Sequence, residues 1–411
     1  MIKFLNNLLP KIKIMRISKL LRINSQFFLD VLIFHLSKLF RAKVDDNLII
    51  FGSTNGKAFM GNPKYIYNYL KQNTNYKLIW FSKSKSLIRE LKLNGIKCVY
   101  NFSIEAVRLL RKARAVFVSH GYEDILPIKF SPRSVTIQTW HGGDIKIIGN
   151  HPYYTKYIYS KWTTLLRAKL RDHQMFDYLL STSGSERPLE ILSSALRFPK
   201  ERILSFGYPR NDIFFALDLD LIKKLRDKYN ISNNFKRIIL YAPTYREVFT
   251  TKDPFSSDAF IKINHFCKKT NSIFLIKAHI NESIIKLESL GNIHILNKDS
   301  DTQEILCITD ILITDYSSIY HDFLLLNRPV LLYTYDYDEY VSKRGIYYDK
   351  LEEIAPGPIL YTSDELLDAL NNIDEIKKKY EKKSEELRNY FNKYIDGKST
   401  ERLLKFLKLI K

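Results

Sequence analysis

Hydrophobic and polar positions alternate in short blocks along the chain after residue 45. Apolar runs that end at or near Gly, Ser or Asn are typical of buried strands leading into turns. In the first part of the chain these runs are 47–53, 77–82, 96–100, 115–121, 134–140 and 178–184. Amphipathic stretches such as 62–73 and 104–113 lie between them. The pattern therefore predicts parallel strands joined by helical crossovers.

The same alternation restarts in the second part of the chain, after the segment GYPRNDIFF at 207–215. The predicted strands there are 237–246, 272–279, 292–297, 310–318 and 329–336. From about Asp364 the chain is charged and has a helical pattern without a further strand. We therefore predict an α/β protein with two Rossmann-like domains, 45–206 and 207–385, followed by a C-terminal helix at 386–411.

The first 44 residues follow a different pattern and form a separate, basic amphipathic segment. Nine Lys or Arg and a single acidic residue, Asp30, are interspersed with Ile, Leu, Met and Phe over residues 1–43. The apolar run 27–36 is shorter than the roughly 20 residues that a membrane span needs, and no small-residue cleavage site follows it. We expect an interfacial helix on an anionic membrane surface. The alternative is a helix packed on the domains with a solvated basic face.

The charge of the whole chain, +21, favours partners that are polyanions, although a compositional bias toward Lys would also produce it. Nucleic acid ranks low among these partners because neither aromatic-rich basic strands nor a recognition helix is evident. Three widely spaced cysteines, Cys98, Cys267 and Cys307, support neither a disulfide framework nor a zinc site. We interpret them as buried thiols.

His141, in the stretch QTWHGGDIK, lies just past the end of a predicted strand. Doubly wound sheets bind ligands at the carboxyl ends of their strands. An imidazole can act as a general base near neutral pH, and Gly142 and Gly143 would let a substrate approach closely. The alternative is a histidine that only satisfies a turn.

The stretch TDYSSIYHDF, 314–323, predicts a strand end followed by a helix. Ser317 and Ser318 would occupy the cap and first turn, where hydroxyls and backbone N–H groups can hold an anion. Ordinary helix capping is the alternative.

Further strand ends supply groups that suit a phosphate. Arg246 and Arg344 could make bidentate contacts, and His279 could donate from another strand end. Solvated arginines and a structural histidine are the alternatives. The carboxylate pairs at 218–220 and 336–338 suggest a solvated helix face and a loop, so we expect no metal site and no cofactor.

Taken in order, WHGGDIK, GYPRND, YAPTYR, KAH, LITDYSSIYHDF and RGIYYD resemble the CDP-glycerol:poly(glycerophosphate) glycerophosphotransferase family over about 47–385. The resemblance implies a glycosyltransferase-B-like fold that holds a CDP-alcohol between two domains. It also implies a peripheral enzyme on the cytoplasmic face of the cell membrane. The chain departs from the usual family pattern at Gly143 and Asp144, at Ile280, and at His321 to Phe323.

The resemblance also implies roles for particular residues. The two functional histidines of the family fall on His141 and His279, and the phosphate-binding groups fall on Arg246, Ser317 and Ser318. Arg210 in GYPRND could serve the domain seam or the nucleotide, although a structural turn is the simpler interpretation.

We therefore expect transfer of glycerol phosphate, or a related polyol phosphate, from a CDP-alcohol such as CDP-glycerol. The acceptor would be a hydroxyl of a lipid-linked glycan or polyol phosphate in teichoic-acid-like or capsular polymer synthesis, and CMP would be released. A nucleotide-sugar glycosyltransferase of surface polysaccharide synthesis is the first alternative, and a basic nucleic-acid-binding protein is the second.

Overall fold

The computed structural model describes residues 30, 32–39, 42–148, 176–244, 246, 253–277, 291–297 and 299–411. These residues separate into two compact units. The first unit takes the described residues within 30–59, 70–138 and 176–178. The second takes those within 60–69, 139–148 and 179–411. The predicted domain boundary between residues 206 and 207 stays a prediction.

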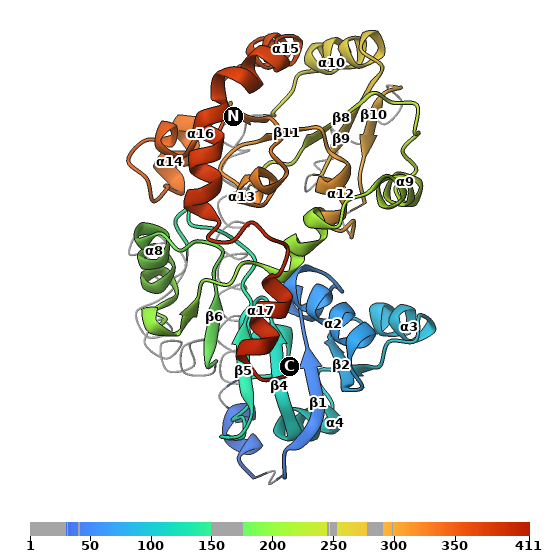
Figure 1. Ribbon diagram of the computed structural model, residues 1–411, viewed down its shortest axis with the longest axis vertical. Coiled ribbons are helices and arrows are strands. Elements are labelled where there is room, and N and C mark those ends of the chain that lie inside the picture. Colours follow the sequence, from blue (N-terminus) through green and yellow to red (C-terminus); the bar gives the residue numbers. More distant parts are fainter. Residues whose placement is uncertain are drawn as a thin grey trace, which may run out of the picture. The chain divides into compact units, whose positions relative to one another are not determined.

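Within the described residues the strands form two sheets (Figure 1). The first has the order β3-β2-β1-β4-β5-β6-β7 and the second the order β10-β9-β8-β11-β12-β13. Strands of the first sheet are β1 (Asp45–Phe51), β2 (Lys77–Ser82), β3 (Cys98–Tyr100), β4 (Ala113–Val118), β5 (Val135–Gln138), β6 (Tyr178–Leu180) and β7 (Ile203–Leu204). Strands of the second are β8 (Arg237–Tyr241), β9 (Ser272–Ile276), β10 (Ile293–Ile295), β11 (Ile311–Thr314), β12 (Val330–Tyr333) and β13 (Ile359–Leu360). The pairings are parallel, which confirms the α/β prediction.

Helices connect most of these strands. The α-helices are α2 (Gly61–Asn73), α3 (Lys85–Leu93), α4 (Ile104–Lys112), α8 (Glu186–Leu196), α9 (Leu219–Lys228), α10 (Ser257–Lys269), α12 (Thr302–Ile308), α13 (Ile319–Phe323), α14 (Tyr337–Lys343), α15 (Ser363–Asn371), α16 (Ile373–Phe391) and α17 (Ser399–Phe406). Short 3₁₀ helices are η1 (Thr54–Gly56), η2 (Gly121–Asp124), η3 (Lys200–Arg202), η4 (Pro209–Phe215), η5 (Leu324–Leu326) and η6 (Leu351–Ile354). The charged tail is helical, as its pattern predicts, but the predicted C-terminal helix 386–411 is not one helix, because α16 ends at Phe391 and α17 begins at Ser399.

Successive side chains of a strand point to opposite sides of the sheet, and helices cover both sides of the second sheet. In β8, Ile238 and Leu240 pack in a core shared with α9, α12, α13 and α16. Ile239 and Tyr241 pack on the other face with α10 and α15, which lie side by side in Figure 1. Continuous apolar runs in the sequence are therefore strands covered by helices on both faces.

The first unit has its own core around β1, whose Ile49, Ile50 and Phe51 are fully buried. The ring of Phe51 stacks on Trp80 in β2 and on Phe117 in β4, with centroids 6.2 Å and 5.5 Å apart. Aromatic side chains on three neighbouring strands thus fill one layer of this core.

The strands end earlier than the sequence pattern predicts, because the polar residues that follow them leave the sheet. The predicted strand 237–246 ends at Tyr241, and within the apolar run 310–318 the strand ends at Thr314, as the stretch 314–323 indicates. The backbone N–H of Thr244 donates instead to a side-chain oxygen of Asp315, at 2.8 Å. Both strand ends therefore lead into polar loops that bond to each other.

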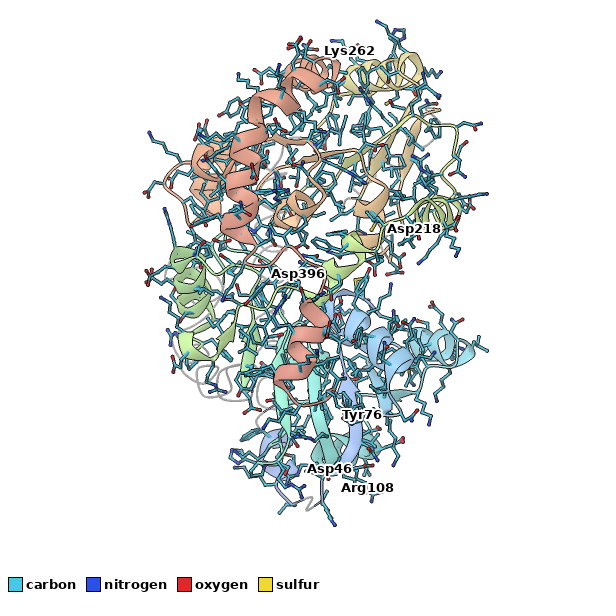
Figure 2. All side chains as sticks on the ribbon, in the orientation of Figure 1. Asp46, Tyr76, Arg108, Asp218, Lys262 and Asp396 are labelled. Atoms are coloured by element: carbon cyan, nitrogen blue, oxygen red, sulfur yellow. The ribbon has the colours of Figure 1, made fainter. Side chains whose placement is uncertain are left out.

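Short polar side chains begin many of the helices. Ser84, Ser103, Asp218, Ser256, Asp301 and Thr362 accept a backbone N–H from the first turn of the helix that follows. Asp218 therefore caps α9, and it is labelled in Figure 2 at the start of that helix. This confirms that the pair at 218–220 belongs to a charged helical segment.

Most of the predicted membrane-associating segment, 1–44, lies outside the described residues. Residues 32–37 are helical, and the hydroxyl of Ser37 accepts the backbone N–H of Lys129 at 3.0 Å. In the part of the chain that is described, no helix combines the length and the apolar character that crossing a bilayer requires.

Candidate active site

The loop that carries His141 follows β5, and consecutive carbonyls along it are held by side chains. Asn62 donates to the carbonyls of Thr139 and Trp140, at 2.8 Å and 3.1 Å. Arg210 Nη1 donates to the carbonyl of His141 at 3.0 Å. These bonds fix the backbone from which the exposed His141 side chain projects.

Trp140 adopts a left-handed conformation, with φ of 55°. A bulky side chain rarely adopts that conformation, and such strain costs about 1–3 kcal/mol. It persists only where the surroundings determine the backbone, which the bonds to the neighbouring carbonyls do here. The indole of Trp140 lies against the His141 ring, with centroids 4.5 Å apart.

The structure brings the His141 loop and the serine pair together. The backbone N–H of Gly143 donates to Ser318 Oγ at 2.8 Å. Ser318, expected in the first turn, stands instead at the N-cap position of α13, and its hydroxyl accepts no bond from that helix. Ser317 Oγ accepts the N–H of Ile319 at 3.4 Å, so both serines precede the first turn and do not enter it. The expectation that one of them occupies the first turn is wrong.

Arg210, on η4, is nearly buried and is paired with Asp322 of α13. Its Nε and Nη2 contact the same carboxylate oxygen at 3.0 Å and 2.7 Å. Side chains of Asn211 and Gln303 donate to that carboxylate at 2.8 Å and 2.9 Å. The guanidinium is therefore held on one edge by Asp322 and reaches the His141 carbonyl with the other.

Arg246 lies after β8 and is also paired with buried carboxylates. Its Nη2 is 2.8 Å from Asp315, and its Nε is 2.8 Å from Asp336. Burial alone would lower the pKa of Arg246, but Asp315 and Asp336 raise it well above its usual value. The alternative of a solvated arginine is excluded for Arg246, whose guanidinium lies beside the segment that leads into Ser317.

The remaining predicted residues are placed as follows. Arg344 is half-buried and ends α14, where its N–H donates to the carbonyl of Tyr340 at 2.8 Å. His279 lies outside the described residues. In the pair at 336–338, Asp336 is the buried partner of Arg246 and Asp338 lies within α14, so the predicted loop is partly helical. Among the described residues, no group of His, Cys, Asp or Glu has the arrangement of a metal site.

Asp144, which follows Gly142 and Gly143 in the chain, forms a second polar cluster with Tyr348 and His321. Tyr348 donates a hydrogen bond to Asp144, and His321 Nδ1 is 3.8 Å from the same carboxylate. Burial raises the pKa of Asp144 to about 6, against the opposing effect of the Tyr348 bond. Burial also lowers the pKa of His321 to about 3, so its imidazole is neutral at physiological pH. His321 stacks on Phe391 at 3.6 Å and is unsuited to proton transfer at neutral pH.

These buried groups line a small hollow beside the His141 loop. Gly142, Gly143, Asp144, Ser181, Thr182, Ser183, Pro188, Leu192, Tyr208, His321 and Phe391 form its walls. Its empty space is about 290 Å³, part of it open to solvent. In its wall, the hydroxyls of Ser183 and Tyr208 donate to the carbonyls of Tyr390 and Gly142, at 2.6 Å and 2.8 Å.

The sequence pattern does not reveal the parts played by Asp144, Asp322 and Asp336. One signal was available for Asp322, because it follows Ser318 by four residues and so shares a helix face with it. The partners of all three aspartates are distant in sequence, and spacing alone could not identify them.

Comparison with known proteins places this geometry in a family. The model of the CDP-glycerol:poly(glycerophosphate) glycerophosphotransferase family matches residues 33–409. A teichoic acid glycerol-phosphate transferase of Staphylococcus aureus is 30% identical over 372 residues, which cover 89% of this chain and 94% of the relative. A teichoic acid poly(glycerol phosphate) polymerase of Bacillus spizizenii is 31% identical over 366 residues, covering 85% and 88%.

Solved structures agree with the sequence comparison. The structure of a histidine-to-alanine variant of the wall teichoic acid polymerase TagF matches with a TM-score of 0.76 and 26% identity, and the match covers 96% of this chain and 97% of that one. A variant of the same polymerase soaked with CDPG matches with a TM-score of 0.76 as well, at 26% identity and covering 96% and 98%. The glycosyltransferase-B-like prediction is therefore confirmed.

Close packing around Gly143 generates a prediction. A Cβ at Gly143 would lie 2.6 Å from His321 Nδ1 and 2.7 Å from Ser318 Cβ, whereas a Cβ at Gly142 meets nothing closer than 3.7 Å. We expect Gly143→Ala to lower the free energy of unfolding by about 1–3 kcal/mol, as overpacking does, and Gly142→Ala to leave it nearly unchanged. Urea unfolding of the two variants measures this. Equal stabilities would show that the loop does not pack against α13 as described.

Proposed function

This chain belongs to the CDP-glycerol:poly(glycerophosphate) glycerophosphotransferase family, and we propose the reaction and residue roles that follow from that membership. The enzyme transfers glycerol phosphate, or a related polyol phosphate, from a CDP-alcohol to an acceptor hydroxyl and releases CMP. One observation carries the proposal: the Gly143 N–H to Ser318 bond sets a histidine loop against a serine loop. The names of the relatives, a glycerol-phosphate transferase and a poly(glycerol phosphate) polymerase, support it.

In the proposed reaction an acceptor oxygen attacks the phosphorus that carries the alcohol. A new P–O bond forms, the bond from that phosphorus to the bridging oxygen breaks, and CMP leaves with the bridging oxygen. His141 takes the hydroxyl proton as general base, because its imidazole is exposed and its backbone is fixed. His279 is assigned to the donor phosphates on the resemblance alone.

On the donor side, we assign the diphosphate to Ser317 and Ser318. Ser318 Oγ accepts the Gly143 N–H, so its own O–H proton can be donated to a phosphate oxygen. Arg246 and Arg344 complete the donor side. Two carboxylates already balance the charge of Arg246, so its main contribution is to hold Asp315, two residues before Ser317. Fixed donors of this kind stabilise charge that develops on a leaving phosphate.

The acceptor in this proposal is a lipid-linked glycan or polyol phosphate at the cytoplasmic face of the membrane. Residues 1–44 would bring the enzyme to that surface, because their basic residues attract anionic headgroups and their apolar residues suit the interface. Residence at the surface raises the effective concentration of an acceptor confined there.

The base assignment predicts a selective loss of turnover. His141→Ala should lower kcat by about 10²–10⁴-fold and leave binding of the CDP-alcohol within a few-fold, because a base acts mainly in the transition state. CMP release and calorimetric titration of the donor measure the two effects. His265→Ala, which removes an exposed histidine on α10, is the matched control. Near-normal turnover of His141→Ala would remove His141 from the mechanism.

The donor assignment predicts a selective loss of affinity. Replacing Ser317 and Ser318 together by Ala should weaken CDP-alcohol binding by roughly 1.5–3 kcal/mol for each charge-assisted bond lost, and CMP binding by less. Replacing Ser193 and Ser194 of α8, whose hydroxyls bond only to nearby carbonyls, controls for the loss of two serines. Unchanged donor affinity in the first pair of substitutions would move the phosphate site elsewhere.

The membrane assignment predicts salt-sensitive binding to vesicles. The full chain should bind anionic vesicles more than neutral ones, and less at high salt, since each Lys or Arg near the surface contributes about 1 kcal/mol that ions screen. Deleting 1–43 should remove most of this binding and preserve activity on a short soluble acceptor. Cosedimentation measures the first effect, and a full-length protein that ignores anionic vesicles at low salt would contradict the assignment.

A further inference from the structure

Arg210 bonds to the backbone of the residue proposed as the base, and it does so from a nearly buried position. The guanidinium is 10% exposed and the partner carboxylate of Asp322 is 3% exposed. We propose that Arg210 is a positioning residue for His141, with Asp322 as its anchor. This role rests on the proposed function, because it has consequences for turnover only if His141 acts in the reaction.

The planar shape of the guanidinium lets it serve two partners at once. The edge formed by Nε and Nη2 faces Asp322, at 3.0 Å and 2.7 Å, and Nη1 reaches the carbonyl of His141 at 3.0 Å. Lysine has a single ammonium at the end of a flexible stem and lacks this fork. It can keep the charge beside Asp322 without reproducing both contacts.

The carboxylate of Asp322 cannot turn away from Arg210 freely, because other groups hold it. Asn211 donates to its Oδ1 at 2.8 Å, and Gln303 donates to its Oδ2 at 2.9 Å. The backbone N–H of Arg210 itself donates to Asn62, whose amide also holds the Thr139 and Trp140 carbonyls. The backbone and the guanidinium of Arg210 are thus both bonded to groups that hold the loop.

The contacts of Arg210 with Asp322 and with the His141 carbonyl form what we call the Arg210 clamp, and the strained backbone next to His141 explains why it is needed. Trp140 has a φ of 55°, a conformation that a tryptophan leaves readily when it is not constrained. The His141 carbonyl is the next acceptor along the chain, so the Arg210 bond fixes the peptide plane that follows His141. Releasing that plane would let the loop rotate and displace the imidazole from its acceptor.

Asp322 also links this clamp to the serine pair, because Ser318 and Asp322 belong to one short segment around α13. Ser318 accepts the Gly143 N–H directly, and Asp322 accepts from Arg210, which in turn donates to the His141 carbonyl, so this segment holds the His141 loop once directly and once through Arg210. The distance between the base and the donor serines is therefore set by one rigid piece of chain. A displacement of about 1 Å in such an arrangement can lower turnover by about 10²-fold.

The test compares Arg210→Lys with a matched arginine elsewhere in the same unit. Arg402 also joins a carboxylate, Asp396 (labelled in Figure 2), to a backbone carbonyl, that of Phe206 at 2.7 Å. We expect Arg210→Lys to lower kcat by about 10–100-fold while donor KM changes by less than about threefold. Arg402→Lys should leave both constants unchanged.

A second variant separates positioning from stability. In Arg210→Ala, millimolar guanidinium ion added to the assay should restore part of the lost kcat by occupying the space between Asp322 and the His141 carbonyl. The same ion should not raise the activity of Arg402→Ala or of the unmodified enzyme. Restored turnover supports the clamp, since a generally unstable fold would not be repaired by a weak denaturant.

The outcomes distinguish this inference from the proposed function. If His141→Ala is inactive while Arg210→Lys turns over normally, the positioning role is wrong and the function stands. If His141→Ala is fully active, the function itself is wrong. A loss of turnover in Arg210→Ala that guanidinium leaves unchanged, with equal losses in the Arg402 variants, would also overturn the positioning role.

Discussion

The buried ion pair between Arg210 and Asp322 is the interaction on which the rest of the site depends. A charge taken out of water is costly unless a partner and hydrogen bonds replace the lost hydration, and removing one partner typically costs about 3–5 kcal/mol. Here the pair is completed by Asn211, Gln303 and the His141 carbonyl. One of the contacts that compensate the buried charges of the pair therefore also holds the His141 loop in place.

The segment from Asp315 to Asp322 holds the other parts of the donor side in the same way, by hydrogen bonds and ion pairs. Asp315 holds Arg246, Ser318 holds Gly143, and Asp322 holds Arg210. The alternation of acid and hydroxyl along a strand end and a short helix thus anchors three loops. Close approach of the backbone at Gly143 is part of the same packing, since a side chain there would collide with His321. Rigidity at this point is what fixed catalytic donors need.

Much of the fold could be predicted from sequence because strands and helices are set by local patterns. The apolar runs became strands, and the amphipathic stretches between them became helices. The contacts that build the site could not be predicted in the same way. Gly143 and Ser318 are 175 positions apart, and Arg210 and Asp322 are 112 apart. Ser318 was a plausible cap for its own helix, and nothing local shows that its hydroxyl accepts from a distant loop.

Transfer of a polyol phosphate from a CDP-alcohol to a hydroxyl can be followed in the products of this enzyme. The most direct measurement is mass analysis of products after the full chain is incubated with a lipid-linked acceptor and CDP-glycerol, CDP-ribitol or UDP-sugars in turn. We expect an acceptor heavier by polyol phosphate units, with one CMP released for each unit and no product from the UDP-sugars. Transfer of a sugar from a UDP-sugar, or an acceptor left unmodified by every CDP-alcohol, would contradict this expectation.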